Sequence, residues 1–364
     1  MPLSRVKPEH YDTLLADKVQ RVSTLLSPWC EMAPEVFASP MSGFRMRAEF
    51  RVWHDGDALD YVMFRPEDRK TPVPISRFPI ACADIQALMP VLMQRLRADA
   101  VLRRKLFQVE FLGTLAGDTL VTLVYHRRLD ADWESKATVL ANELGISIVG
   151  RSRKQKLVIG RDYVCECLEI DNRQYQYRQY EQAFTQPNAR VNTLMIEWAC
   201  RQARELDGDL LELYCGNGNF TLPLAAHFDN VIATELSKRS VAAARENIAA
   251  NEIDNVQVIR LAAEEVTQAI RGEREFRRLA GLPRPLAEYA LDTIFVDPPR
   301  AGLDQYTVSM TAGFETVLYI SCNPRTLADN LRSLEQTHRV AQFALFDQFP
   351  YTDHMECGVL LRRA

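Results

Sequence analysis

The spacing of apolar positions changes near the middle of the chain. Before residue 179, apolar and charged residues mostly alternate in short runs, which predicts antiparallel strands with a few helices between them. After residue 179, short apolar runs take turns with longer segments of helical period, which predicts βα units and a parallel sheet. We therefore expect two domains, an α+β domain at 1–178 and an α/β domain at 179–364.

The first half is predicted to combine three helices with three pairs of strands. Helical spacing predicts helices over 11–25, 81–98 and 131–144. Alternation predicts strand pairs over 44–64, 106–125 and 146–160. Pro90 predicts a kink or break in the second helix, and Gly145 ends the third. This order suits a small open-faced sheet of the RNA-recognition kind, although the aromatic signature of that fold is missing.

Cationic side chains gather in this half. The hairpin at 44–64 has its turn at 54–57 and places Phe44, Met46, Ala48, Phe50 and Val52 on one face and Arg45, Arg47, Glu49 and Arg51 on the other. Three arginines on one strand face suit phosphate binding, and solvated surface is the alternative. Phe107 and Phe111 are candidates for stacking on bases, with core packing as the alternative.

The second half predicts a doubly wound sheet. Strands are expected in the runs LLELYC, VIATEL, VQVIRL, LDTIFVDPP and TVLYISCNP, each connected to the next by a helix or an excursion. The last 26 residues contain two strands around a polar turn and no helix. We expect them to pair antiparallel at the sheet edge.

Composition and charge narrow the class of protein. The chain has 364 residues, of which 47% are hydrophobic, enough for two cores at ~150 residues per domain. No apolar run approaches the ~18 residues of a membrane span, and residues 1–20 are charged throughout, so we expect a cytoplasmic protein. The net charge is −4, with a positive excess before residue 179 and a negative one after it. Local basic clusters matter more for RNA binding than this total.

The cysteines predict no metal site. Eight of them occur, at positions 30, 82, 165, 167, 200, 215, 322 and 357. None has the C-x-x-C spacing of a zinc ligand pair, and the C-E-C pair of Cys165 and Cys167 is only a weak signal of a metal site. We interpret them as reduced thiols.

A glycine loop in LLELYCGNGNF follows a strand and opens a helix. Gly216 and Gly218 permit a tight turn and close approach of a ligand, but Thr221 takes the place of the third glycine of a dinucleotide motif. With Glu212 in the strand and Glu235 at the end of the next one, where an acid suits a ribose diol, the loop favours a nucleoside without a pyrophosphate. NAD is the alternative. The combination resembles class I S-adenosylmethionine methyltransferases.

The run TIFVDPPRAGL ends a strand with Asp297-Pro298-Pro299-Arg300. It resembles the [DN]-P-P motif of methyltransferases that act on planar bases. Prolines fix the loop, so a base lies against it while Asp297 faces the cofactor. A plain turn is the alternative.

Cys322 lies at the carboxyl end of the following strand, where ligand crevices form in such sheets. We expect the helix that starts near Thr326, with Arg300 and Arg325, to lower the pKa of its thiol. A thiolate beside a methyl donor can add to C6 of a pyrimidine and activate C5, and a base must then remove the C5 proton. Glu356 is the favoured base. The alternatives are Asp347, Asp353 and His354.

Six motifs together resemble the tRNA (uracil-5-)-methyltransferase family: FRMRAEFRVWHDGD, FTQPN, LLELYCGNGNF, TIFVDPPRAGLD, YISCNPRTL and FDQFPYTDHMECGVLL. The resemblance covers nearly the whole chain. It implies Cys322 as nucleophile and Glu356 as base. It also implies that S-adenosylmethionine is contacted by Gln186, Tyr214, Asn219, Glu235 and Asp297. A flipped uridine is implied as the target, with Phe107 and Arg51 as RNA contacts.

The expected fold is thus a class I methyltransferase domain, with a Rossmann-like sheet and an antiparallel edge hairpin, joined to an α+β RNA-binding domain. The expected substrate is the T-arm of tRNA, and the chemistry also permits transfer-messenger RNA. We expect no membrane contact and no obligate protein partner. A ribosomal-RNA uridine methyltransferase is the nearer alternative, disfavoured because Cys30 and Cys82 are isolated rather than part of an iron–sulfur cluster. An RNA-binding or RNA-remodelling protein is the other, disfavoured because Cys322 and Glu356 are both present.

Overall fold

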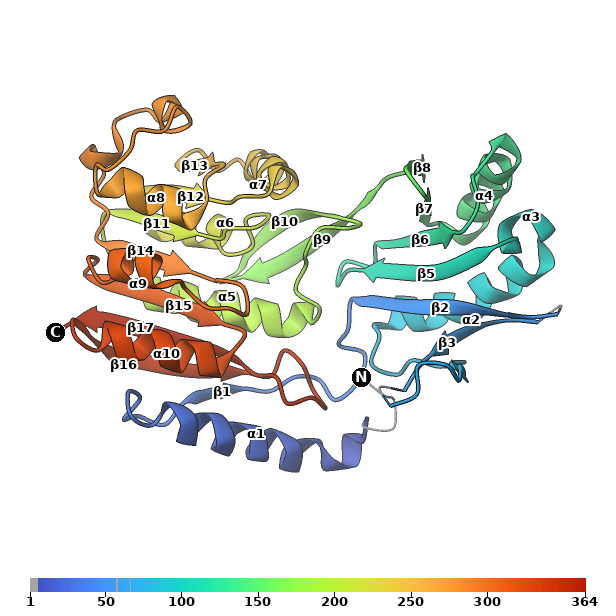
Figure 1. Ribbon diagram of the computed structural model, residues 1–364, viewed down its shortest axis with the longest axis horizontal. Helices are drawn as coiled ribbons and strands as arrows, with labels where there is room; N and C mark the ends of the chain where they lie inside the picture. The colour runs from blue at the N-terminus through green and yellow to red at the C-terminus, as the bar shows by residue number, and fades with distance from the viewer. Residues whose placement is uncertain (1–5, 57, 66) are drawn as a thin grey trace. The chain divides into compact units, whose positions relative to one another are not determined.

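A computed structural model describes residues 6–56, 58–65 and 67–364 (Figure 1). The chain forms two compact units that interleave in sequence. The first contains the residues up to Glu9, Pro40–Cys167 and Arg178–Ala189, and the second contains His10–Ser39, Leu168–Tyr177 and Arg190–Ala364. The sequence pattern predicts one boundary after residue 178, whereas here the amino-terminal helix belongs to the second unit. Its residues Val22 and Leu26 are buried in the core of that unit, which explains the difference.

An eight-stranded sheet forms the centre of the second unit. Its strands in spatial order are β1 (Glu35–Phe37), β16 (His338–Phe346), β17 (Glu356–Arg363), β15 (Thr316–Ser321), β14 (Thr293–Val296), β11 (Asp209–Leu213), β12 (Asn230–Thr234) and β13 (Val256–Ile259). Neighbouring strands run parallel except where β17 is a partner. The expected antiparallel pairing of the last two strands is confirmed. The edge of the sheet differs from the expectation, because β1 pairs with β16 and is itself the outermost strand.

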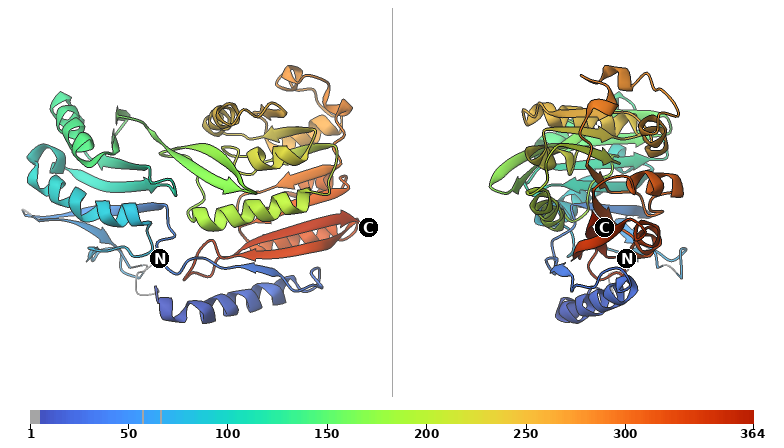
Figure 2. Two further views of the ribbon diagram at one scale, coloured as in Figure 1. Left: turned by 180° about the vertical axis from the view of Figure 1, so that it is seen from behind. Right: turned by 90° about the vertical axis from the view of Figure 1, so that its left-hand side faces the viewer.

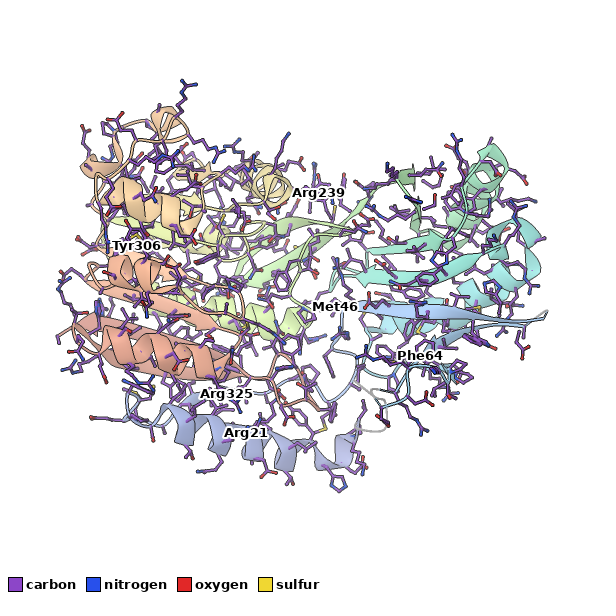
Figure 3. All side chains as sticks on the ribbon, in the orientation of Figure 1. Arg21, Met46, Phe64, Arg239, Tyr306 and Arg325 are labelled. Atoms are coloured by element: carbon purple, nitrogen blue, oxygen red, sulfur yellow. The ribbon has the colours of Figure 1, made fainter. Side chains whose placement is uncertain are left out.

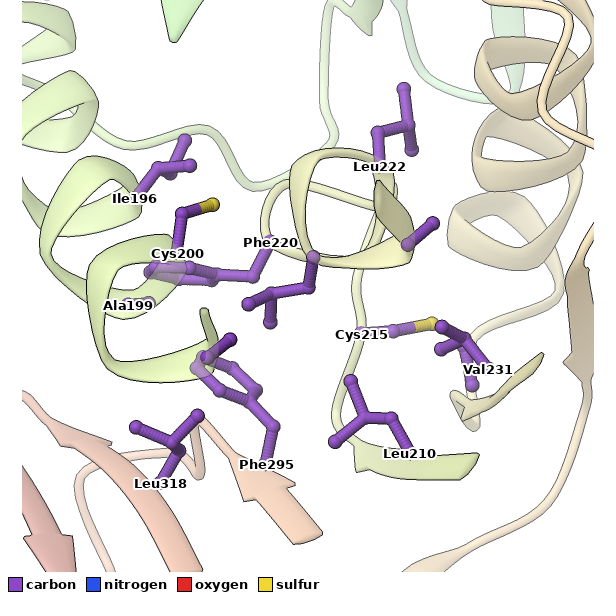
Figure 4. Packing of buried hydrophobic residues seen from close by; sticks show 14 of the residues in the cluster. Ile196, Ala199, Cys200, Leu210, Cys215, Phe220, Leu222, Val231, Phe295 and Leu318 are labelled. Carbon is purple, nitrogen blue, oxygen red and sulfur yellow. The ribbon is translucent and has the colours of Figure 1, made fainter. Parts of the chain in front are cut away.

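Helices cover both faces of this sheet, as Figures 1 and 2 show. One face carries α5 (Ala189–Ala203), α6 (Thr221–Leu224) and α7 (Lys238–Ala250). The other carries α1 (Tyr11–Leu26), α8 (Ala263–Ile270), α9 (Gln305–Thr311) and α10 (Pro324–Leu334). Each face has its own apolar cluster. Figure 4 shows part of the first, where Phe295 of β14 and Leu318 of β15 lie among side chains of α5 and α6. The doubly wound fold predicted for this part of the chain is confirmed.

The first unit contains a seven-stranded mixed sheet. Its strands in spatial order are β4 (Val73–Pro74), β3 (Ala58–Met63), β2 (Arg47–Asp55), β5 (Leu106–Gly113), β6 (Thr119–Tyr125), β7 (Ser147–Ser152) and β8 (Gln155–Ile159). Its helices are α2 (Ala83–Ala98), α3 (Ala100–Arg103) and α4 (Ala131–Leu144). The sheet is larger than expected, and one pairing differs in direction, because α4 returns the chain so that β7 runs parallel to β6. A further hairpin, β9 (Tyr163–Ile170) with β10 (Arg173–Tyr180), is divided between the two units.

Local predictions for the first unit hold in most places. The face from Phe44 to Val52 is buried, as its alternation predicts. Gly145 ends α4 in the left-handed conformation at φ 65°. Helix α2 continues through Pro90 rather than breaking there. Phe111 is 1% exposed and meets Phe50 edge-on, so it is a core residue and not a stacking platform.

Candidate functional site

Four parallel strands of the second unit deliver the candidate residues to one edge of its sheet. Tyr214 follows β11, Glu235 follows β12, Asp297 follows β14 and Cys322 follows β15. These strands are neighbours and run in the same direction. Their carboxyl ends therefore lie together at the edge where ligands bind in open α/β sheets. This arrangement agrees with the sequence prediction for these four residues.

The glycine loop after β11 has the backbone of a tight turn. Tyr214, Gly216 and Gly218 have φ values of 62°, 57° and 89°. A Cβ on Gly218 would lie 2.5 Å from Cδ1 of Leu222, so the loop needs glycine there both for conformation and for space. A Cβ on Gly216 would meet nothing within 4 Å, which leaves open space beside the loop. A left-handed tyrosine at this position costs energy, and such strain is concentrated at functional sites.

Side chains on both sides fix this loop. The Glu235 carboxylate accepts hydrogen bonds from the Gly216 N–H at 3.2 Å and the Ser237 N–H at 2.7 Å. The Asn219 amide forms a reciprocal pair with Asn192 of α5, at 2.8 and 2.9 Å. Tyr177 of β10 donates its hydroxyl to the Asn219 carbonyl at 3.1 Å. Asn192 and Tyr177 were not predicted from the sequence, because nothing in their own segments points to the loop.

Glu212 provides a test of whether this edge suits a cofactor. It lies in β11 and is 1% exposed, and burial raises the pKa of its carboxyl to about 8. The Thr221 hydroxyl lies near this carboxyl and opposes the rise in its pKa, but neither Glu212 Oε2 nor that hydroxyl has a hydrogen bond of good geometry among the described residues. A buried acceptor without a partner is costly. With the open space at Gly216 and the acid at Glu235, these residues fit an adenosyl amino acid, which brings a ribose diol and an ammonium group.

Gln186 lies apart from these residues in the chain. It belongs to the first unit and is half-buried in the irregular segment before α5. Its predicted contact with the cofactor stays a prediction.

The loop after β14 is fastened to the start of α10. Asn323 caps α10 by accepting the Arg325 N–H at 3.2 Å, and its amide donates to the Arg300 carbonyl at 2.9 Å. Asn330 Oδ1 accepts both the Leu303 N–H at 2.9 Å and the Tyr319 hydroxyl at 2.7 Å. These two asparagines hold the Asp297–Arg300 turn against the segment that carries Cys322. Only Asn323 carries a sequence signal, as an N-cap residue before a proline.

Strand pairing brings Cys322 beside Glu356. In the antiparallel register of β15 and β17, Ser321 is opposite Cys357. Cys322 directly follows Ser321 in the chain, and Glu356 directly precedes Cys357. They are therefore neighbours although 34 positions separate them in the sequence. Both lie at the edge that Asp297 also reaches.

The electrostatics of these three groups differ from the sequence prediction. Burial, with Glu356 and Asp297 nearby, raises the pKa of the Cys322 thiol to about 11, and Arg300 opposes this rise. The expected lowering by the helix terminus is therefore wrong for the free protein, because desolvation and two carboxyl groups outweigh the positive charges. Burial and Asp297 raise the pKa of Glu356 to about 8, and burial raises that of Asp297 to about 7.

The three alternatives to Glu356 lie on the loop between β16 and β17. Asp347 is 1% exposed and is bound to Tyr11 and Lys18 of α1. Asp353 is exposed and forms an ion pair with Arg21 at 3.4 Å. His354 is exposed as well. Glu356, 3% exposed, is the buried carboxyl next to Cys322.

A cavity of about 650 Å³ opens at Cys322. Its lining residues are Arg21, Val22, Leu25, Arg300, Cys322, Asn323, Pro324, Arg325, Asp353 and His354. Three arginines line this cavity, two of which, Arg21 on α1 and Arg325 in α10, are labelled in Figure 3. Space and positive charge at this mouth suit a nucleotide with its phosphate.

In the first unit, Phe107 lies in a stack of three side chains. The Arg51 guanidinium lies 3.5 Å from the Phe107 ring centre, and the His126 ring lies 3.9 Å from it at 29°. Burial lowers the pKa of Arg45 and Arg47, and Arg47 donates to the Glu181 carbonyl at 3.0 Å. Of the three arginines on this strand, Arg51 is thus the exposed one.

Neither a metal-ion site nor a membrane-spanning helix is found among the described residues. No three His, Cys, Asp or Glu side chains of that part of the chain are grouped to hold a metal ion. No described helix is long and apolar enough to span a membrane.

Comparisons with known proteins agree with this geometry. A sequence profile of the family described as tRNA (Uracil-5-)-methyltransferase matches residues 10–364. A Dickeya chrysanthemi protein named tRNA/tmRNA (uracil-C(5))-methyltransferase is 54% identical over 360 residues, which cover 98% of this chain and 97% of that protein. A protein of the same name from Aromatoleum aromaticum is 52% identical over 363 residues, covering 100% and 98%.

A solved structure shares the fold. The Pyrococcus abyssi tRNA (uracil-54, C5)-methyltransferase in complex with S-adenosyl-L-homocysteine has a TM-score of 0.73 at 21% identity, covering 96% of this chain and 83% of that one. Fold and site thus define a class I methyltransferase with a second, α+β unit. The full-length similarity is more specific, and by it the chain belongs to the tRNA (uracil-5-)-methyltransferase family.

The raised pKa of Cys322 predicts slow alkylation of the free protein. Because only the thiolate reacts, the rate with iodoacetamide should rise about tenfold per pH unit between about pH 8 and 10. At fixed pH, Glu356→Gln should react faster, since Glu356 raises the pKa, and Arg300→Gln should react slower, since Arg300 lowers it. Mass spectrometry of the Cys322 peptide measures the rate, with exposed Cys165 as the internal control. A plateau below pH 8 would contradict the prediction.

Proposed function

We propose that this protein transfers a methyl group from S-adenosylmethionine to C5 of a uridine in the T-loop of tRNA, and also in the tRNA-like part of transfer-messenger RNA. The observation that carries this function is the pairing of Cys322 with Glu356 across β15 and β17 in a chain more than 50% identical to tRNA/tmRNA (uracil-C(5))-methyltransferases over its full length. A tRNA substrate also implies action in the cytoplasm.

The glycine loop and the strand ends beside it hold the cofactor. Glu235 binds the ribose diol, Tyr214 and Asn219 line the loop side, and Asp297 and Gln186 complete the contacts. S-adenosylmethionine supplies an electrophilic methyl group on a sulfonium. The fixed position of Asn219, bound through both Asn192 and Tyr177, supports its role as a contact.

Cys322 activates the base. Its thiolate adds to C6 of uracil, which forms an S–C6 bond and moves the electrons of the C5–C6 double bond onto C5 as an enolate. C5 is then nucleophilic enough to take the methyl group. The nearby Arg300 guanidinium, which opposes the rise in the pKa of Cys322, favours the thiolate. The two prolines after Asp297 form a rigid wall for the flat base.

Glu356 completes the reaction. After methylation, it removes the proton from C5, the C5–C6 double bond reforms, and the S–C6 bond breaks to release the Cys322 thiolate. A general base works best when its pKa lies near the operating pH. Burial that raises the pKa of Glu356 to about 8 supports this role.

The first unit supplies RNA contacts. Arg51 and Phe107, stacked on each other in the exposed group with His126, are the proposed contacts. Their combination of charge and ring face suits a nucleotide. The rival substrate, ribosomal RNA, would use the same chemistry on a different RNA, and the second rival, an RNA-binding or remodelling protein, would bind RNA without transfer.

Methyl transfer to RNA tests the function. Labelled S-adenosylmethionine, the protein and an unmodified tRNA transcript should give 5-methyluridine in the T-loop, and unmodified ribosomal RNA should stay unlabelled. Nuclease digestion and mass spectrometry identify the nucleoside and its position. Label in ribosomal RNA alone would move the function to the first rival, and no label in either RNA would favour the second.

The proposed roles of Glu356 and Cys322 predict that substitution of each residue stops the reaction at a different stage. Glu356→Gln should methylate the RNA and release it about 10²–10⁴-fold more slowly, so that a methylated covalent complex accumulates. Cys322→Ala should form no complex and no product, although it binds S-adenosylmethionine. Denaturing gels detect the covalent RNA. Product release by Glu356→Gln at the wild-type rate, or methylation by Cys322→Ala, would contradict the assignment.

A further inference from the structure

A second basic region lies in the first unit, beside the Phe107 stack. A cavity of about 640 Å³ is lined by the end of β6 and its following residues, Tyr125–Arg128, and by the β7–β8 turn, Ser152–Gln155. No carboxylate is among these described lining residues. His126 belongs both to the cavity and to the stack with Phe107 and Arg51, so the two features form one continuous surface.

The cationic side chains at and beside the turn between β7 and β8 are of two kinds, those held in ion pairs and those without one among the described residues. Arg151 and Lys156 are opposite each other in the register, and both form ion pairs with Glu181. Arg153 and Lys154 form the two-residue turn between the strands and are exposed. Neither has an ion pair with another described residue. The turn therefore presents two positive charges that the fold does not neutralise.

Hydrogen bonds within the protein connect the two walls of the cavity. The Gln155 amide bridges its two walls, because it accepts the Leu129 N–H at 2.9 Å and donates to the Leu129 carbonyl at 2.8 Å. The Arg127 guanidinium is held by hydrogen bonds within the protein, since it donates to the carbonyls of Val101 at 2.8 Å and Arg104 at 3.0 Å. Arg128, Arg153 and Lys154 remain as exposed cations around the opening.

We propose that this cavity binds the phosphate backbone of the tRNA through Arg128, Arg153 and Lys154, next to the nucleotide that contacts the Arg51–Phe107–His126 stack. A rigid concave surface with several cations and no carboxylate matches the charge and spacing of successive phosphates. The site rests on the function proposed above, since it positions the same RNA substrate.

Charge removal tests the site. The variant Arg128→Gln/Arg153→Gln/Lys154→Gln should bind an unmodified tRNA transcript about tenfold more weakly, and its slope of log affinity against log salt should become shallower by about 2–3. The turnover number at saturating tRNA should stay at the wild-type value. Filter binding across a salt series measures the slope.

A matched control separates a site from general charge. The variant Arg69→Gln/Lys70→Gln/Arg77→Gln removes the same charge from exposed positions of the same unit, outside the cavity. It should keep the wild-type salt slope. An equal loss of slope in both variants, or no loss in the first, would overturn the site. A wild-type protein that methylates no tRNA would overturn the proposed function instead.

An independent observation concerns the amino-terminal helix. Tyr11 and Lys18 lie two turns apart on α1, on the side that contacts the loop between β16 and β17. The Tyr11 hydroxyl donates to Asp347 Oδ2 at 2.9 Å, and Lys18 donates to Asp347 Oδ1 and to the Phe349 carbonyl, the latter at 3.1 Å. All three side chains are at most 5% exposed. The loop that starts at Asp347 ends at Glu356.

The same helix holds the loop at further points. The rings of Tyr11 and Tyr351 meet edge-on at 5.9 Å, and Arg21 donates to the Asp353 carbonyl at 3.0 Å. Next to α1, the Asp347 N–H donates to the Phe37 carbonyl of β1 at 2.9 Å. The loop before Glu356 is thus attached along its length to α1 and β1.

A buried ion pair is a weak source of stability, because desolvation cancels most of its attraction and apolar residues often replace it without loss. Burial lowers the pKa of Lys18, which reflects that desolvation cost. We infer that Lys18, Asp347 and Tyr11 are positioning residues that hold Glu356 at the distance from C5 that proton removal requires. This role rests on the proposed base function of Glu356.

The test replaces the pair by apolar residues. Lys18→Met/Asp347→Leu should stay folded and keep S-adenosylmethionine binding, yet release product about 10²-fold more slowly and accumulate the methylated covalent complex, because a displacement of ~1 Å costs about that factor. A merely structural role would not produce that complex. Release at the wild-type rate would overturn the inference.

Two variants complete the design. Tyr11→Phe removes the hydrogen bond to Asp347 and the one that the hydroxyl accepts from the Ser39 N–H. It should accumulate the complex to a smaller extent, so it decides the question if the double variant does not fold; release from it at the wild-type rate would then overturn the inference. Glu35→Leu/Arg201→Met removes an exposed pair between β1 and α5 and should behave as wild type. Accumulation in that control as well would also overturn the inference. A wild type that forms no 5-methyluridine would overturn the proposed function itself.

Discussion

The insertion of β17 between β15 and β16 is the constraint on which the site depends. The antiparallel register places Ser321 opposite Cys357, and every other pairing in this sheet outside β17 is parallel. A parallel sheet alone would bring only residues that follow its strands to the ligand edge. One reversed strand lets a residue that opens a strand, Glu356, reach the same edge as Cys322. Cys322 and Glu356 are thus brought together by hydrogen bonds of the backbone.

The chemistry of the site follows from burying several acidic groups together. Glu212 and Glu356 are buried and Asp297 is half-buried, and burial raises the pKa of each carboxyl to about 7 or 8. Burial, together with Glu356 and Asp297, raises the pKa of the Cys322 thiol to about 11. The Cys322 thiol of the free protein is therefore protonated at neutral pH, and the positive charge of Arg300 favours the thiolate. Such a site resists premature reaction of the thiol with other electrophiles.

Helix α1 belongs to the second unit, although its position in the sequence assigns it to the first half. Its apolar face is buried in the α/β core, and its polar side holds the loop that leads to Glu356. Sequence position alone assigns it to the first half, because the predicted domain boundary lies after residue 178. The helix instead packs with the carboxy-terminal part of the chain in the second unit.

The sequence by itself determined most element types, the doubly wound half and the glycine loop, because each lies in a short segment whose local pattern carries the signal. It also predicts roles for Glu235, Asp297, Cys322 and Glu356, which stay predictions. Tertiary structure decided the rest. It assigned α1 to the second unit, made β7 parallel to β6, placed Phe111 in the core, paired Asp347 with Lys18 and reversed the expected shift in the pKa of Cys322. All of these depend on burial and on partners distant in sequence, which a local pattern of residues does not contain.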